Sequence, residues 1–183
     1  MKKIIKQYWL LVTIASSILI LDQVTKAIVR ANIPFGGRWM PIEWLAPYFR
    51  FVHWENTGAA FGLFQQGGLV FAVLAVIVSV FIVAYYPQVP KEDTLMRVAL
   101  AMQLGGALGN LIDRVVFGPV TDFISVMSFP VFNIADSSIT VGVGLLILGL
   151  WISDRREKEA GGSTDAASVS PDQEAVEAPE ELA

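Results

Sequence analysis

The chain contains no cysteine and only one histidine, His53. The absence of cysteine excludes a disulfide framework, a thiol nucleophile and a cysteine-ligated zinc site. A single histidine argues against a histidine-based zinc site and against a serine–histidine–aspartate triad. We interpret His53 as a strand residue without a catalytic role, and the sequence predicts neither a metal nor another cofactor.

Charged residues are also few. They make up 16% of the 183 residues, whereas hydrophobic residues make up 54% and the mean hydropathy is +0.56. Four stretches approach the roughly 20 apolar residues that a membrane-spanning helix needs. They cover about residues 8–29, 68–86, 95–112 and 135–152. We therefore predict a membrane protein, mainly α-helical, with four transmembrane helices in contact with membrane lipids.

Lysine and arginine near the ends of these stretches predict the orientation. One side carries eight basic residues, Lys2, Lys3, Lys6, Lys91, Arg97, Arg155, Arg156 and Lys158. The other side carries four, Arg30, Arg38, Arg50 and Arg114, spread over two longer loops. This bias predicts that both termini are cytoplasmic and that the loops 30–67 and 113–134 lie outside.

The first stretch follows a Lys-Lys pair and could be taken for a signal peptide. Its apolar core is long for a signal peptide, and no small-x-small cleavage site follows it. We therefore expect an uncleaved transmembrane helix at this end of the chain.

The composition changes at Asp154. Residues 154–183 hold nine acidic and three basic residues, with glycine, serine, proline and alanine between them. This predicts a disordered acidic cytoplasmic tail after a membrane domain of residues 1–153. The overall charge of −4 is a property of this tail and gives no reason to expect nucleic-acid binding.

The loop 30–67 is too long for a turn between helices. Its segments 38–44 and 50–54 are rich in aromatic and β-branched residues, which favours strands. We expect a small extracytoplasmic β-sheet here. Its tryptophans, Trp39, Trp44 and Trp54, fit either an interfacial belt or a platform that cradles a substrate.

Asp122 and Asp136 are the most informative polar residues. A carboxylate near hydrocarbon costs a few kcal/mol or more, so such a residue usually has a function. The predicted topology puts Asp122 on the second outer loop and Asp136 in the first turn of the fourth helix, at the same depth. Two adjacent carboxylates can hold one proton between them and activate water. The alternative for Asp136 is a helix-start acid that pairs with Asn133 as the N-cap.

Other polar residues cluster at the outer helix ends. Asp22 and Lys26 are spaced to pair on one helix face; Lys26 could instead bind a substrate carbonyl or a lipid phosphate. Asn110, Asp113 and Arg114 end the third helix. Arg114 could reach the headgroups; alternatively, Asp113 and Arg114 could both brace the neighbouring loop.

Asn56 and Gly58 follow the predicted strand 50–54. An asparagine can donate and accept at once, so Asn56 could orient a carboxylate or a substrate backbone. The alternative is ordinary turn chemistry with Gly58. The glycines that precede Asn110, at 105, 106 and 109, are typical of close helix packing in membranes.

Five motifs occur in order and together closely resemble the bacterial lipoprotein signal peptidases, or signal peptidase II. They are Asp22-Gln-x-x-Lys26, Asn56-x-Gly-Ala-Ala-Phe61, Gly105-Gly-Ala-x-Gly-Asn110-x-x-Asp113-Arg114, Val120-x-Asp122-Phe123 and Phe132-Asn-x-Ala-Asp136-x-x-Ile139. The resemblance covers about residues 5–153.

The resemblance implies an aspartic endopeptidase of the bacterial inner membrane, with Asp122 and Asp136 as the catalytic pair and the active site on the periplasmic side. It implies cleavage of diacylglyceryl-modified prolipoproteins just before the lipidated cysteine, and inhibition by the cyclic peptide globomycin. Asn56, Gly58, Asn110, Asn133 and Arg114 are then expected to bind or orient the substrate or the pair, while Asp22, Lys26 and Asp113 support them. We expect a monomer.

A non-enzymatic solute carrier would also place aspartate, asparagine and lysine in the membrane. A carrier is expected to have charges at the bilayer midplane and internal pseudo-symmetry. Here the polar residues gather at the outer helix ends and no repeat is visible. A membrane-bound binding scaffold is a third alternative, but it gives no reason for the two aspartates.

Overall fold

The computed structural model describes residues 2–58 and 67–167, with side chains from 7 to 58 and from 67 to 155. Its elements are α1 (Lys2–Asn32), β1 (Arg38–Trp39), the 3₁₀ turn η1 (Glu43–Leu45), β2 (Phe49–Asn56), α2 (Gly68–Tyr85), the 3₁₀ turn η3 (Tyr86–Gln88), α3 (Thr94–Val116), β3 (Val120–Val126) and α4 (Ile134–Ala167). All contacts discussed below lie in the unit that ends at Leu146.

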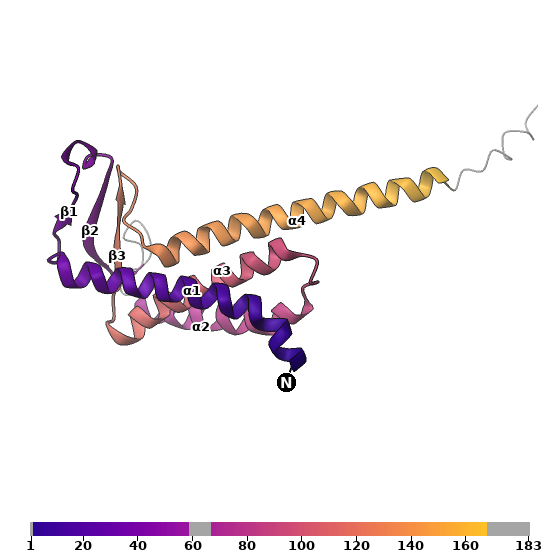
Figure 1. The fold of residues 1–183 in the computed structure, drawn as a ribbon, viewed down its shortest axis with the longest axis horizontal. Helices are drawn as coiled ribbons and strands as arrows, with labels where there is room; N and C mark the ends of the chain where they lie inside the picture. Colours follow the sequence, from indigo (N-terminus) through magenta and orange to yellow (C-terminus); the bar gives the residue numbers. More distant parts are fainter. Residues whose placement is uncertain (1, 59–66, 168–183) are drawn as a thin grey trace, which may run out of the picture. The chain divides into compact units, whose positions relative to one another are not determined.

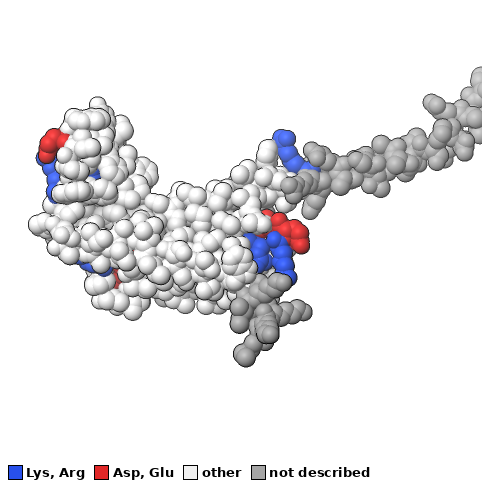
Figure 2. Space-filling view, in the orientation of Figure 1, with Lys and Arg blue, Asp and Glu red and all other residues white. Residues whose placement is uncertain are grey.

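Four helices are long and apolar enough to cross a membrane. The candidate spans are Gln7–Asn32, Gly68–Gln88, Thr94–Val116 and Ile134–Arg155. They confirm the four predicted helices with small shifts at the ends. On the face that Figure 2 shows, the surface over the helices is almost free of charged side chains, as a surface that contacts lipid should be.

The helix α3 lies at the centre of the helical layer, between α1 and α2 (Figure 1). In its apolar window 61% of the residues are buried, against 11% for α2 and 22% for α1. Its N-cap Asp93 accepts a hydrogen bond of 3.0 Å from the backbone N–H of Met96, which satisfies one free donor of the first turn. A central α3 brings its polar C-terminal end into contact with several other elements.

Glycines let the helices approach α3 closely, as the sequence predicts. A Cβ on Gly105 would lie 2.8 Å from the carbonyl oxygen of Ala15 on α1. A Cβ on Gly106 would lie 2.5 Å from the carbonyl oxygen of Ala135 on α4. Neither distance leaves room for a methyl group, so α3 is held between backbones on both sides.

The β-sheet has three antiparallel strands in the order β1-β2-β3. The strand expected at 50–54 is confirmed within β2. The expected segment 38–44 forms only the two-residue β1 before the chain turns into η1. The third strand was not predicted: β3 follows Gly118, whose φ of 90° suits glycine, and its β-branched residues favour a strand.

The fourth helix extends further than the sequence suggested. It continues from Ile134 to Ala167, although the composition changes at Asp154. The residues just after Asp154 are mostly arginine, glutamate, lysine and alanine, which are good helix formers even where they are polar. Residues 154–167 belong to this helix and 168–183 lie outside the described residues, so the disordered acidic tail stays a prediction.

Candidate active site

Asp122 and Asp136 come from different elements, and a single residue contacts both carboxylates. Asp122 lies in the middle of β3 and Asp136 in the first turn of α4. Asn133 donates from its side-chain nitrogen to Oδ1 of Asp122 at 2.7 Å. Its backbone N–H donates to Oδ2 of Asp136 at 3.2 Å. The two aspartates are thus brought to one site, as their predicted depth required.

Asn133 and Asp136 also form a reciprocal helix cap. The Asp136 backbone N–H donates to Oδ1 of Asn133 at 2.9 Å, while the Asp136 carboxylate accepts from the Asn133 backbone. This is the geometry of a capping box. The helix-start interpretation of Asp136 is therefore correct, and it does not exclude a second role, because its Oδ1 faces the site.

Three asparagine amides point at the two carboxylates. Asn56 and Asn133 donate to Asp122 at 3.0 and 2.7 Å. Asn110 donates to Oδ1 of Asp136 at 2.7 Å. Hydrogen bonds from N–H groups favour the ionised form of a carboxylate, so they offset part of the cost of burial.

Each of these amides is held in one orientation by a group that can only donate. The Oδ1 atom of Asn56 accepts from the Gly58 backbone N–H at 3.0 Å. The Oδ1 atom of Asn133 accepts from the Asp136 backbone N–H, and that of Asn110 from the Lys26 ammonium at 2.9 Å. A flipped amide would place two donors together. For Asn56, turn geometry with Gly58 and contact with a carboxylate thus coexist.

Asp122 is buried, with 1% of its surface exposed. Burial and the nearby Asp136 carboxylate raise its pKa to about 7. Hydrogen bonds from Asn56 and Asn133 and the charge of Lys26 act in the opposite direction. An acid with this pKa can hold or release a proton near neutral pH, which suits acid–base chemistry.

Behind the two carboxylates lies a buried ion cluster centred on Lys26. The Lys26 ammonium lies 2.8 Å from Asp22 and 3.2 Å from Asp113, in addition to its contact with Asn110. All three charged side chains have no exposed surface. The predicted pair of Asp22 and Lys26 is confirmed. The alternative, that Lys26 binds a substrate carbonyl or a lipid phosphate, is wrong, because its three donors are already used.

The two acids of this cluster fix the backbone beside the candidate pair. Asp113 accepts from the Thr121 backbone N–H at 2.9 Å, and Asp22 from that of Ala135 at 2.9 Å. Asp113 therefore braces the neighbouring segment, as the sequence suggested. Asp22 does the same across the helix packing, which could not be foreseen.

Three supporting contacts were missed by sequence reasoning. Gln23 donates to Asp113 at 3.1 Å and to the Gly109 carbonyl at 3.0 Å. Arg30 donates to the Thr121 hydroxyl at 2.9 Å. The position of Gln23 within the Asp22-Gln-x-x-Lys26 motif could have indicated a role at the site. No sequence pattern indicates such a role for Arg30 or Thr121.

A cleft of about 500 Å³ opens beside Asp136. Its polar lining includes five of the predicted residues, Asn56, Gly58, Asn110, Arg114 and Asp136. The rest is largely apolar, with Phe71 from α2, Ile139 and Val141 from α4 and the segment from Phe129 to Phe132. Arg114 lies over the Phe71 ring at 5.5 Å. The cleft can thus take a ligand with a polar backbone and an apolar part.

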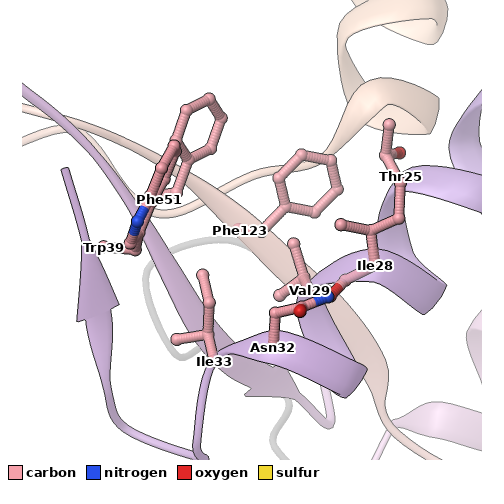
Figure 3. Close-up of a pocket in the computed structure, with 8 residues that line it drawn as sticks. All are labelled: Thr25, Ile28, Val29, Asn32, Ile33, Trp39, Phe51 and Phe123. Carbon is pink, nitrogen blue, oxygen red and sulfur yellow. The ribbon is translucent and has the colours of Figure 1, made fainter. Parts of the chain in front are cut away.

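A second groove of about 560 Å³ lies between the C-terminal end of α1 and the sheet. Its lining is mainly apolar, with Ile28 and Val29 from α1, Ile33 just after that helix, and Trp39, Phe51 and Phe123 from the sheet (Figure 3). Trp39, one of the tryptophans that fit a substrate platform, lines it, but neither aspartate nor any of the predicted orienting residues does. The cleft beside Asp136, although not the larger of the two, is the one that meets the polar site.

Within the residues described, no group of three histidine or acidic side chains is arranged to hold a metal ion. His53 is buried in the sheet, where its Nδ1 lies 2.8 Å from the Ile33 carbonyl oxygen. Of the five motifs, only residues 59–61 of the second fall outside the described residues.

Comparison with known proteins gives a consistent result. Residues 14–152 match the family described as Signal peptidase (SPase) II. The lipoprotein signal peptidase of Ectopseudomonas mendocina is 44% identical over 161 residues, which cover 83% of this chain and 92% of that protein. The lipoprotein signal peptidase of Moorella thermoacetica is 41% identical over 133 residues, covering 73% and 87%.

Solved structures show the same architecture. A bacterial membrane enzyme solved at 2.3 Å resolution superposes with a TM-score of 0.75 at 35% sequence identity. The match covers 81% of this chain and 92% of the other. A second structure of a bacterial membrane enzyme, at 1.9 Å, gives a TM-score of 0.68 at 35% identity, covering 76% and 91%.

Proposed function

Because the chain belongs to the signal peptidase II family of lipoprotein signal peptidases, we propose that Asp122 and Asp136 are the catalytic pair of an aspartic endopeptidase. Family membership supports the removal of signal peptides from prolipoproteins. The observation that carries the catalytic assignment is the convergence of three asparagine amides and the Asn133 backbone N–H on two otherwise unrelated carboxylates. Such a site holds two acids together in a largely apolar protein at considerable cost.

In the proposed mechanism the pair holds one proton near neutral pH. Two close carboxylates do not both ionise readily, so their titrations split and belong to the pair. The ionised aspartate takes a proton from the attacking water, while the protonated one donates a hydrogen bond to the scissile carbonyl. As the tetrahedral intermediate collapses, a proton passes to the leaving amine. A pKa of about 7 for Asp122 supports this one-proton state.

The cleft beside Asp136 supports a lipid-modified substrate. Peptide backbone would lie along Asn56, Gly58 and Arg114, and the acyl chains would lie on the apolar side lined by Phe71 and Val141. The diacylglyceryl group would then hold the scissile bond, just before the lipidated cysteine, at the depth of the pair. The peptide inhibitor globomycin would compete for the same cleft.

The orientation follows from the distribution of basic residues. We infer a multi-pass protein of the bacterial inner membrane with both termini in the cytoplasm. The site then lies on the periplasmic side, at the outer ends of α1, α3 and α4. We expect the protein to act as a monomer, because one chain supplies every residue of the proposed site.

The decisive experiment is cleavage of a diacylglyceryl-modified prolipoprotein by the purified protein in detergent, with the shorter product followed on a gel. Asp122→Asn and Asp136→Asn should each lower the rate by at least 10²–10⁴-fold without loss of folded protein. The matched control is Asp93→Asn, at the opposite end of α3 from Asn110, where asparagine still caps the helix. Normal turnover by Asp122→Asn or Asp136→Asn would refute the assignment of the catalytic pair.

Two further experiments test the substrate and the mechanism separately. The precursor without its lipid should be cut poorly, because it lacks the group that holds it at the cleft. Exhaustive chelation should leave the rate unchanged, since the scheme uses carboxylates alone. A strict requirement for zinc or calcium would count against the mechanism while leaving the peptidase assignment intact.

A further inference from the structure

Lys26 stands apart from the other groups that hold the asparagine amides in place. Asn56 and Asn133 are oriented by backbone N–H groups, which no substitution at another residue removes directly. Asn110 is oriented by the Lys26 side chain, whose ammonium donates to its Oδ1 at 2.9 Å. Of these three amides, Asn110 is therefore the one whose orientation depends on a distant charged residue.

We propose that Lys26 is a positioning residue for the catalytic pair, which acts through Asn110 and makes no contact with substrate. The Lys26 ammonium fixes the Asn110 carbonyl oxygen, and the amide nitrogen is then directed at Asp136 at 2.7 Å. The proposal rests on the proposed function, because it assigns a role within the same site.

The contact between the two asparagines extends the effect to Asp122. Oδ1 of Asn110 also accepts from the Asn133 side-chain nitrogen at 3.1 Å, and that same nitrogen donates to Asp122 at 2.7 Å. One oxygen atom, held by Lys26, thus lies between the amides that serve the two carboxylates. If Asn110 flipped, its nitrogen would face Lys26 and Asn133, and its oxygen would face Asp136.

The Lys26 side chain is itself held in place by two buried ion pairs. Asp22 and Asp113 hold its ammonium at 2.8 and 3.2 Å, and the side chain has no exposed surface. Its three acceptors are Asp22, Asp113 and Asn110. Burial also excludes direct contact of Lys26 with a substrate in the cleft beside Asp136.

The charged groups around the catalytic pair predict a pH effect. Lys26 and Asp22 face it from α1 and Arg114 from α3, and the two aspartates face each other. Behind them, Asp113 on α3 pairs with Lys26 and lies 3.8 Å from Arg30 on α1. Among these charges, Lys26 lowers the pKa of Asp122. Loss of the ammonium should therefore move the acid limb of the activity profile to higher pH.

The test is a double-mutant cycle with Lys26→Met and Asn110→Ala, measured on the lipidated precursor from acid to alkaline pH. Each single variant should lower kcat by roughly 10- to 100-fold and change KM by less than about threefold. Each should shift the acid limb by roughly 1 pH unit. The double variant should be about as impaired as either single variant, because both remove the same step.

Folding is monitored by the melting temperature of each variant. Lys26→Met removes the ammonium that both Asp22 and Asp113 contact and leaves only Arg30, 3.8 Å from Asp113, so it could fail to fold. Asn110→Ala keeps the ion pairs of Lys26 with Asp22 and Asp113 and removes only its third acceptor. The acid limb of this variant therefore tests the proposal even if Lys26→Met does not fold. Lys26→Arg keeps a buried cation that can donate and should retain more activity than Lys26→Met. Ser17→Ala is the control on α1, where the hydroxyl bonds only to the Thr13 carbonyl.

An acid limb that stays at the wild-type pH in folded Asn110→Ala or Lys26→Met would overturn the proposal. Effects on kcat that multiply in the double variant would also overturn it, because they indicate separate structural roles. Failure of the wild-type protein to cut the precursor would instead refute the proposed function. This inference alone would be refuted if the wild type cleaves the precursor, the Asp122→Asn and Asp136→Asn variants do not, and the acid limb of Asn110→Ala stays at the wild-type pH.

Discussion

Asp22 and Asp113 occupy matching positions relative to the two candidate catalytic carboxylates. Asp22 accepts the backbone N–H of Ala135, one residue before Asp136, and Asp113 accepts that of Thr121, one residue before Asp122, each at 2.9 Å. Both acids also bind the Lys26 ammonium. One buried cation thus ties together the backbone positions from which the two carboxylates project.

Removal of either acid should therefore destabilise the protein and misplace one carboxylate. Asp22→Ala and Asp113→Ala each leave Lys26 with one carboxylate fewer and free a buried N–H group. We expect a loss of about 3–5 kcal/mol in the free energy of unfolding, measured by denaturant titration in detergent. Asp93→Ala, which removes only the N-cap of α3, should cost about 1 kcal/mol. Equal losses in all three variants would contradict a special role for the cluster.

Close packing between α3 and α4 gives a second prediction. Gly106→Ala places a methyl group 2.5 Å from the Ala135 carbonyl oxygen and 2.5 Å from the Ser138 hydroxyl. The helices must then separate next to Asp136, so both the melting temperature and the cleavage rate should fall. Gly144→Ala is the matched control on α4, since nothing lies within 4 Å of its Cβ. It should be neutral or raise the melting temperature, because alanine favours helix over glycine.

The helices and the polar residues could be predicted from the sequence, for physical reasons that apply locally. The segment that became α2 is apolar throughout, and lipid dictates a helix wherever such a segment crosses. Asn133 and Asp136 have the spacing of a helix cap, and Asn56 and Gly58 that of a turn. Each of these assignments depends on a few neighbouring residues.

What could not be predicted depends on contacts between distant segments. The hydrogen bond from Ala135 to Asp22 joins residues 113 positions apart, and no local pattern announces it. The strand β3 was not predicted because it forms by pairing with β2, which is distant in the sequence. The local interpretations of Asn56 and Asp136 looked like alternatives to function. In both side chains, however, one polar atom accepts a backbone hydrogen bond and the other contacts a polar group of the site.

The raised pKa of Asp122 predicts how stability varies with pH. With a pKa of about 7 in the folded protein, against 3.8 ordinarily, the folded state retains a proton that the unfolded chain releases between these values. Stability from this group is therefore complete below about pH 4 and is lost as the pH rises through 7. Its size is on the order of a few kcal/mol. The melting temperature of Asp122→Asn should decline less between pH 5 and 8 than that of the wild type. Parallel curves would contradict the raised pKa.

Asn133 allows its structural and catalytic roles to be separated. Serine is as good an N-cap as asparagine, so Asn133→Ser should preserve the start of α4 and change stability by less than about 1 kcal/mol. Serine is too short to replace the side-chain nitrogen that donates to Asp122 at 2.7 Å. The cleavage rate should fall by roughly 10-fold or more, as expected for a lost hydrogen bond to a charged group.

The comparison variant is Asn133→Ala, which loses the cap and the donor together. It should match Asn133→Ser in cleavage rate and melt at a lower temperature. If Asn133→Ser instead cleaves the lipidated precursor at the wild-type rate, the link from Asn133 to Asp122 is structural. The role of Asn133 would then be confined to the start of α4, and the catalytic pair would depend on Asn56 and Asn110 for its orientation.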